Sequence, residues 1–242
     1  MWSIYRKEIN AFFSSVMGYL VIAVFLILMG LFLWVFPEYS ILDYNFATLD
    51  PLFAIAPFIF LFLIPAVTMR SFAEEKNTGT IEFLVTKPVT DTQIILGKYF
   101  ANLSLVVIAL LPTLLYVYTV YELGSPKGNL DTGAIIGSYI GLFFLCAVFV
   151  AIGILSSILS KNQIVAFLLG AFLCFLFQWA FGYLAQMPFF TGEAELFIQK
   201  LGINYHYSSI SKGAIQTKDL VYFLSITGMF LYLSKFIFSN QR

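Results

Sequence analysis

Charged side chains are scarce in this sequence, and their scarcity excludes an ordinary water-soluble domain. Lys, Arg, Asp and Glu make up 11% of the 242 residues, and 60% of the residues are hydrophobic. Soluble domains carry about 25% charged residues. A chain of this size with so few charges cannot cover its surface toward water, so we expect an integral membrane protein. The formal net charge is +0, which favours neither nucleic acid nor an acidic partner.

Residues for catalysis and nucleotide binding are also nearly absent. His206 is the only histidine, which excludes an HExxH metal site, and we expect it in surface or loop packing. Cys146 and Cys174 lie in apolar runs and are expected to be buried thiols. No G-x-x-x-x-G-K-[ST] motif occurs, so the chain does not itself cradle a nucleotide phosphate. We therefore expect a non-catalytic protein with no cofactor or metal of its own.

Six long apolar stretches are present. A hydrocarbon core of about 30 Å takes roughly 20 residues of helix, and lipid offers the backbone no hydrogen-bond partners, so spanning segments must be helical. The sequence predicts an all-α integral membrane protein, with residues 1–242 as one domain. Its six transmembrane helices are expected at about 17–37, 51–69, 94–121, 134–159, 163–186 and 219–238.

The central thirds of these six spans contain no Asp, Glu, Lys, Arg or His. Ion-coupled carriers usually place an ionisable group near the midplane of the membrane. A proton- or sodium-driven transporter is therefore disfavoured, and the energy for any transport must come from elsewhere. The polar residues left in the span cores are Ser104, Ser138, Ser156, Ser157 and Gln178.

Lys and Arg are unevenly divided between the two sides of the predicted bundle. Nine would lie on one side, namely Arg6, Lys7, Arg70, Lys76, Lys87, Lys98, Lys161, Lys235 and Arg242. Four would lie on the other, namely Lys127, Lys200, Lys212 and Lys218. Cytoplasmic loops carry the excess of Lys and Arg. The sequence therefore predicts a multi-pass membrane protein with both termini in the cytoplasm.

Residues 1–16 form a separate feature before the first span. Apolar residues recur at helical spacing, and polar residues occupy the opposite face, which predicts an amphipathic helix in the cytoplasmic interface. This helix is either an anchor or a lever that packs against the membrane portion and touches a cytosolic partner. The apolar set is Trp2, Tyr5, Ile9, Phe12, Phe13 and Val16, and the polar set is Ser3, Arg6, Lys7 and Asn10.

The longest outer loop, residues 187–218, carries three further signals. Its stretch "GEAELFIQKLGI" predicts a short amphipathic helix, Gly213 predicts a turn, and "TKDL" is expected to start the last span.

Residues 69–98, "MRSFAEEKNTGTIEFLVTKPVTDTQIILGK", form a compact charged block in the only sizeable cytoplasmic loop. "SFAE" at 71–74 has the form of a capping box, and Gly79 is a natural helix stop. Thr80 can cap a short helix, "IEFLVT", which Pro88 would end. Thr90 and Gln93 form a second capping box that starts the third span.

The short helix predicted here carries more apolar side chains than water would tolerate. They either rest on the lipid interface and under the spans or fill a groove on a soluble partner. Arg70 and Lys98 flank the block. They either extend to lipid headgroups or pair with Glu74 or Glu75 to fix the loop. The apolar residues concerned are Ile81, Phe83, Leu84 and Val85.

This block resembles the coupling region of ABC-2-type transporter permeases. The matching residues are Arg70, Glu74, Glu75, Gly79, Thr80, Glu82, Pro88, Gly97 and Lys98. "YHYSSISKGAIQTKDLVYF" resembles the family's stretch before its last span, with Ala214 and Gln216 as departures. "FLIPAVTMRSF" and "KNQIVAFLLGAFLCFLF" are similar to the gliding-motility-associated permeases of Bacteroidetes (GldF type). The resemblance covers essentially the whole chain.

The resemblance implies a half-transporter embedded in the lipids of a bacterial inner membrane, with a coupling helix between spans two and three. A separate cytosolic ABC ATPase, GldA-like in the gliding type, would bind ATP and Mg. The other half would be a GldG-like membrane subunit or a second copy of this chain. Alternatives are a force-transmitting or assembly scaffold of the gliding machinery and an intramembrane enzyme. The implied ATPase-coupling residues are Glu74, Glu75, Gly79, Thr80, Ile81, Glu82, Phe83, Leu84 and Pro88, with Arg70 and Lys98 as charges of the coupling loop.

Overall fold

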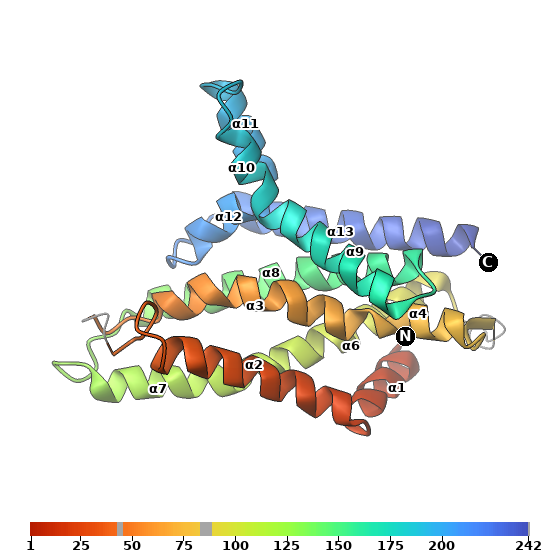
Figure 1. The fold of residues 1–242 in the computed structure, drawn as a ribbon, viewed down its shortest axis with the longest axis horizontal. Helices are drawn as coiled ribbons and strands as arrows, with labels where there is room; N and C mark the ends of the chain where they lie inside the picture. The colour runs from red at the N-terminus through yellow and green to blue at the C-terminus, as the bar shows by residue number, and fades with distance from the viewer. Residues whose placement is uncertain (43–45, 83–88, 242) are drawn as a thin grey trace.

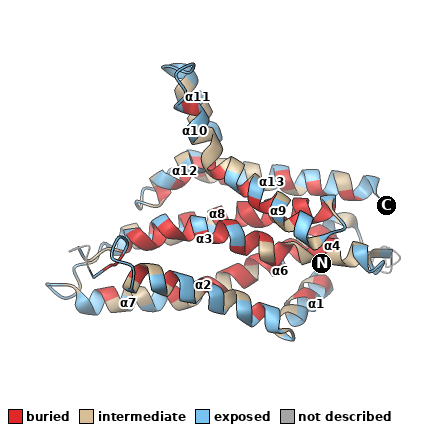
Figure 2. Cartoon of the chain, viewed as in Figure 1, coloured by how far each residue is buried: buried red, intermediate tan, exposed pale blue. Residues whose placement is uncertain are grey.

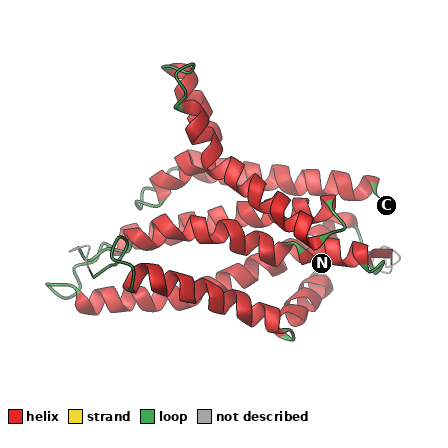
Figure 3. Cartoon of the chain, viewed as in Figure 1, coloured by secondary structure: helices red, strands yellow, loops and turns green. Residues whose placement is uncertain are grey.

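The computed structural model describes residues 1–242 apart from 43–45, 83–88 and 242, and the described residues form helices and no strand (Figure 3). Element η1 is a 3-10 turn, and η2 is a π-helical turn. The elements are α1 (Trp2–Phe13), α2 (Val16–Trp34), α3 (Asp50–Thr68), α4 (Arg70–Asn77), α6 (Asp91–Leu110), η1 (Leu111–Thr113), α7 (Leu114–Leu123), α8 (Thr132–Leu159), α9 (Gln163–Phe175), η2 (Leu176–Ala180), α10 (Phe181–Ala185), α11 (Glu193–Leu201), α12 (Ile203–Ile210) and α13 (Thr217–Asn240).

Six helical stretches of the described residues are long and apolar enough to cross a membrane, which confirms the all-α, six-span prediction. They agree with the predicted spans to within a few residues at each end, except that the second continues through α4. The stretches are Val16–Trp34, Asp50–Asn77, Asp91–Leu123, Thr132–Leu159, Gln163–Ala185 and Thr217–Asn240.

Side-chain caps start several of these helices. Thr90 accepts a hydrogen bond from the backbone N–H of Gln93, and the Gln93 side chain accepts one from Thr90, so the predicted capping box is confirmed. Asp131 and Asn162 cap α8 and α9 in the same way. Each cap satisfies an N–H group that has no partner inside its helix.

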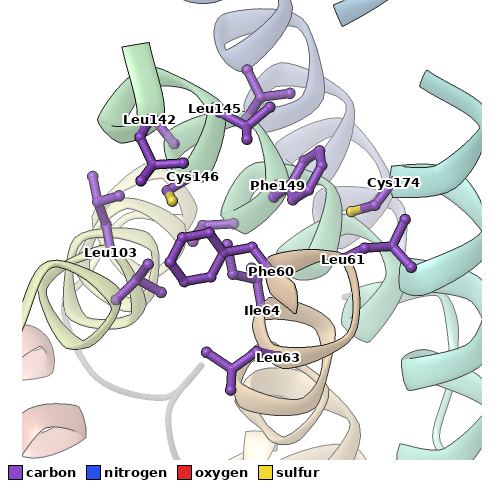
Figure 4. Close-up of a cluster of buried hydrophobic side chains, with 14 of the residues drawn as sticks. Phe60, Leu61, Leu63, Ile64, Leu103, Leu142, Leu145, Cys146, Phe149 and Cys174 are labelled. Carbon is purple, nitrogen blue, oxygen red and sulfur yellow. The ribbon is translucent and has the colours of Figure 1, made fainter. Parts of the chain in front are cut away.

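Helix α8 lies at the centre of the bundle, with α3, α6, α9 and α13 packed around it (Figures 1 and 2). Apolar side chains of α3, α6, α8 and α9 meet in one buried cluster (Figure 4). Cys146 and Cys174 are buried free thiols, as predicted. Since lipid is as apolar as these side chains, close packing stabilises the cluster more than exclusion of water does. The cluster includes Phe60, Ile64, Leu103, Leu142, Leu145 and Phe149.

Pro57 interrupts the backbone hydrogen bonds of α3, and a side chain from α12 replaces the lost partner. Proline has no N–H and leaves the carbonyl four residues earlier without its helical donor, here the carbonyl of Phe53. The Tyr207 hydroxyl donates a 2.7 Å hydrogen bond to that oxygen. Helix α12 is therefore fixed to the start of α3.

Helices α10 and α11 form an arm that extends away from the bundle (Figure 1). Helix α11 confirms the short helix predicted in this loop, and it has no buried residue. Gly213 has φ +83°, a left-handed conformation that favours glycine, so the predicted turn is confirmed. Helix α13 then begins at Thr217, where the last span was expected to start.

The expectation for His206 is wrong. The residue lies on α12, is buried, and contacts Asp219 of α13. The sequence around His206 is polar and rich in serine and tyrosine, which resembles a loop. Contacts of α12 with α8, α11, α13 and η2 enclose it, and those contacts are not visible in the local sequence.

Gly153 marks the closest crossing of the two central helices. A Cβ atom at this position would lie 2.0 Å from Thr68 Oγ1 and 2.8 Å from Thr68 Cβ. The buried Thr68 side chain is held by a 2.9 Å hydrogen bond to Ile64 O. It cannot move aside without losing that bond.

We predict that Gly153→Ala forces α3 and α8 apart. Overpacking of a filled core typically costs about 1–3 kcal/mol, so the variant should unfold at lower temperature in detergent and yield less monodisperse protein. Gly228→Ala on α13 is the matched control, since a Cβ there meets nothing within 4 Å. Equal melting temperatures for the two variants would contradict the close crossing.

Candidate functional site

The junction between α3 and α4 is held by a side chain from α8. Helix α3 ends at Thr68 and α4 begins at Arg70, so the first N–H groups of α4 need acceptors. The Ser157 hydroxyl accepts hydrogen bonds from Phe72 N at 2.9 Å and Ala73 N at 3.1 Å. It also donates to Met69 O at 2.8 Å. One hydroxyl therefore satisfies three backbone groups at the junction.

The capping box predicted at residues 71–74 is wrong. Ser71 lies inside α4, and its hydroxyl accepts a 3.0 Å hydrogen bond from Asn102 Nδ2 of α6. The local sequence fits a capping box. However, the second span continues almost directly into α4, so Ser71 lies inside the helix and not at the residue that precedes it, where a cap acts.

Helix α1 packs on α6 where a glycine lets it approach. A Cβ at Gly97 would lie 3.0 Å from two side-chain atoms of Ile4 and 3.1 Å from Met1 O. The residues of α1 that are buried are Ile4 and Glu8, whereas Trp2 of the predicted apolar face is 69% exposed. The structure thus confirms the packing part of the lever hypothesis for α1.

Lys98 is the centre of the junction. Its ammonium lies 2.8 Å from Glu8 Oε1 of α1 and 3.0 Å from Glu75 Oε1 of α4. It also donates a 2.6 Å hydrogen bond to Ser71 O. An ammonium has three donors, and these three acceptors match that number. The Lys98 side chain is 1% exposed, so the hypothesis that it extends to lipid headgroups is wrong.

Lys7 extends this ion cluster to the surface; we define the cluster as Lys7, Glu8, Glu75 and Lys98. Lys7 Nζ lies 2.8 Å from Glu75 Oε1 and 3.6 Å from Glu8 Oε1. Partial burial lowers the pKa of Lys7, but the hydrogen bonds and negative charges of Glu75 and Glu8 outweigh it, so the pKa is raised. Lys7 therefore stays protonated, and the cluster contains two ammonium and two carboxyl groups.

Arg70 pairs with Glu74 one helical turn further along α4. Arg70 Nε lies 2.8 Å from Glu74 Oε2, and Nη2 lies 3.1 Å from Oε1, a bidentate geometry. Both pairings weighed from the sequence, Arg70 with Glu74 and Lys98 with Glu75, are therefore present. At this partly exposed site the first pair is worth only about 0.3–0.5 kcal/mol, and its main effect is to orient the two side chains.

Two grooves flank the turn that follows α4. One, of about 620 Å³, lies between α1 and α4 and includes Lys7, Phe12, Arg70, Glu74 and Thr80 in its lining. The other, of about 480 Å³, is lined by Lys76, Gly79, Ile81, Glu82, Lys161, Phe238 and Gln241. The turn is thus an accessible projection between two depressions.

The structure brings most of the sequence-predicted site residues together at one end of the bundle. Arg70, Glu74 and Glu75 lie on α4, Gly79 and Thr80 form the turn, and Ile81 and Glu82 follow it. Gly79 has φ +71°, which confirms the predicted helix stop. Phe83, Leu84 and Pro88 lie outside the described residues.

Sequence reasoning missed five residues of this junction: Lys7 as an ion-pair partner, Glu8, Ser71, Asn102 and Ser157. Glu8, the only acid in α1, was the one available signal. A buried basic residue needs a carboxylate partner, so Glu8 could have been paired with Lys98, a basic residue at the start of a span.

Five of the basic residues assigned to the cytoplasmic side lie at this same end. Lys7, Arg70 and Lys98 lie in the junction, and Lys76 and Lys161 line one groove. The Lys76 ammonium donates to Ile158 O and to the side chain of Gln241. The two termini also lie at this end, next to α4 (Figure 1).

These features define a class of protein: a multi-pass helical membrane protein in which a polar junction joins an N-terminal helix to two spans. A family model described as ABC-2 family transporter protein matches residues 36–203. That match covers more than half of the chain, which therefore belongs to the ABC-2 family of transporter proteins. Such proteins are membrane permease subunits that work with an ABC ATPase. A search of curated proteins finds no match.

We predict that Lys98→Met destabilises the junction by about 3–5 kcal/mol, the usual effect of leaving buried charges without their partner. The free energy of unfolding in detergent is the measurement, and Lys235→Met on the exposed part of α13 is the control. Adding Glu8→Gln and Glu75→Gln to Lys98→Met should restore most of the loss, because no unpaired carboxylate then remains. A triple variant no more stable than Lys98→Met would exclude the charge pairing as the cause.

Proposed function

We propose that this chain is the permease half of an ATP-driven transporter and that the turn after α4 receives work from a separate cytosolic ATPase. The observation that carries the proposal is the attachment of α4. It continues from α3, it is capped by Ser157 of α8, and it is ion-paired through Glu75 to α6 and α1. A displacement applied to the turn would reach all four helices.

The residue types present in the chain support a separate ATPase subunit as the source of energy. The sequence has no phosphate-binding loop of its own, and the central thirds of the predicted spans hold no Asp, Glu, Lys, Arg or His. Energy must therefore arrive mechanically, with ATP and Mg held by the ATPase. The coupling surface comprises Gly79, Thr80, Ile81 and Glu82, together with Phe83, Leu84 and Pro88 as the sequence suggests. Because its apolar side chains suit a groove on a soluble partner, they favour a docked helix over a bare loop.

The finer assignment rests on the sequence. Similarity to GldF-type permeases favours a role in gliding motility, with a GldA-like ATPase and with a GldG-like subunit or a second copy as the other half. The excess of Lys and Arg at the α4 end favours a cytoplasmic location for that end and for both termini in a bacterial inner membrane.

Orientation can be tested with an introduced thiol. Thr80 is exposed at the turn, and both native cysteines are buried, so Thr80→Cys offers the reactive thiol. We expect a membrane-impermeant maleimide to label it in inverted vesicles and not in intact cells. Glu193→Cys at the start of α11 should show the reverse pattern. Labelling of Thr80→Cys from outside intact cells would place this turn outside the cytoplasm and would contradict the proposed function.

Coupling can be tested by co-purification. We expect Glu82→Arg, or polar replacement of Phe83 and Leu84, to abolish retention of the ATPase while membrane insertion stays normal. Truncating a central anchor of such a contact typically costs about 2 kcal/mol or more, roughly a 30-fold loss in affinity. Glu193→Arg applies the same charge change to another exposed acid, on α11, and should retain the ATPase. Undiminished retention in all variants would show that the ATPase docks elsewhere.

A further inference from the structure

A buried His–Asp pair joins α12 to α13, remote from the α1–α4 junction. His206 Nδ1 lies 2.7 Å from Asp219 Oδ1, and His206 Nε2 lies 3.0 Å from Lys200 O of α11. His206 is 7% exposed and Asp219 is 0% exposed. The adjoining turn packs on the first residues of α8, where the Ser138 hydroxyl donates to Ser211 O at 2.8 Å. Ser157, at the junction, is on the last turn of the same helix.

The two hydrogen bonds fix the number of protons on His206. A backbone carbonyl can only accept, so Nε2 carries a hydrogen toward Lys200 O. An ionised carboxylate can also only accept, so Nδ1 must carry a hydrogen toward Asp219. A neutral ring has one N–H only, so it would place a lone pair either against Asp219 Oδ1 at 2.7 Å or against Lys200 O at 3.0 Å. With Asp219 ionised, both contacts together therefore require an imidazolium.

The buried charge of Asp219 requires the same proton. Among the described residues, His206 is the one basic group within 4 Å of this carboxylate. The other oxygen, Oδ2, is buried without a hydrogen-bond partner. A buried carboxylate is strongly unfavourable unless it is paired, so the imidazolium is its counter-charge. The ring of Tyr222 stacks on the imidazole with centroids 3.8 Å apart.

The elements packed around the pair offer few other charges. Helix α8 and turn η2 contain no Asp, Glu, Lys, Arg or His, and their titratable groups are Tyr139 and Cys146 of α8. The remaining titratable side chains are Glu193, Glu195 and Lys200 of α11, Tyr205 and Tyr207 of α12, Lys212 of the following turn, and Lys218, Tyr222, Tyr232 and Lys235 of α13. Lys212 and Lys218 line the same pocket as Asp219.

We propose that His206 and Asp219 form a proton-binding latch, which we call the His206–Asp219 latch. Binding of one proton from the compartment at this end of the bundle holds α12 on α13. Loss of that proton leaves one N–H for two acceptors, so a lone pair then faces either the Asp219 carboxylate or Lys200 O and α12 loses one of its two contacts. Helix α12 follows α11 and connects that end of the arm to the bundle, so this one of the arm's two connections depends on pH. The latch is independent of ATPase docking.

The single histidine makes the latch directly observable. In wild-type protein labelled with ¹⁵N-histidine, the chain gives one pair of ring signals by NMR, read without interference from a second site. We expect both nitrogens to be protonated at acid pH and one proton to be lost as the pH is raised. Hydrogen exchange of residues 203–210 should accelerate in the same pH range, because local opening follows loss of the contact.

Asp219→Asn provides the decisive variant. An asparagine amide can donate to Nδ1 of a neutral ring while Nε2–H still donates to Lys200 O, so the contact forms without the extra proton. We expect a neutral Nε2–H tautomer at pH values where wild type is charged, and exchange of residues 203–210 that matches folded wild type at every pH. Glu193→Gln, the same chemical change in the first turn of α11, should behave as wild type.

Three outcomes would overturn the latch. The first is a neutral ring in wild type across the whole titration. The second is loss of the imidazolium signal without any change in exchange of α12. The third is an Asp219→Asn protein whose histidine titrates as in wild type. His206→Ala should show fast exchange of residues 203–210 at every pH, which separates loss of the contact from loss of the proton.

Discussion

The fold of this permease depends on one buried ammonium group. Moving a charge of this size out of water costs several kcal/mol even after relaxation, so Lys98 can lie inside only if acceptors surround it. Glu8, Glu75 and Ser71 O supply them from α1 and α4, and the Phe72 ring lies 5.0 Å away. The requirement is reciprocal, because Glu8 and Glu75 also need the cation. The hydrogen-bond and charge requirements of the Lys98 ammonium therefore fix α1, α4 and α6 relative to one another.

Helix α8 contacts the connecting segments at both ends of the molecule and so links their positions. Its last turn caps α4 through Ser157, the turn before it crosses α3 at Gly153, and its first turns hold the α12–α13 connection at Gly137 and Ser138. At each end of the molecule, a buried charged group that needs a partner joins a peripheral helix to the bundle. Lys98 fills this role at the α4 end, and the His206–Asp219 latch fills it at the other.

Most patterns contained within a few residues were readable from the sequence. The exception is the capping pattern at residues 71–74, because α3 continues almost directly into α4 and Ser71 lies inside that helix. The six spans, the Thr90–Gln93 box and the turn at Gly79 each depend on neighbours in the chain, and all are present. The pairings of Lys98 and Arg70 were one of two alternatives that the sequence offered, because Glu74 and Glu75 lie in the same charged block. Ser157 as the cap of α4, Glu8 as the partner of Lys98 and the burial of His206 were missed. Each depends on a contact across 13 to 90 residues, and no local pattern encodes it.

The reliance of α4 on Ser157 also sets an order of events during biosynthesis. Ser157 is separated from Phe72 by 85 residues. At about 5–20 residues per second, the ribosome reaches that serine roughly 4–17 s after α4 has been made. During this interval the start of α4 has to find temporary acceptors in water, headgroups or the insertion machinery. The fourth span thus supplies the acceptor that the start of α4 lacks until then. A nascent chain that stops before Ser157 would leave the first N–H groups of α4 without that partner.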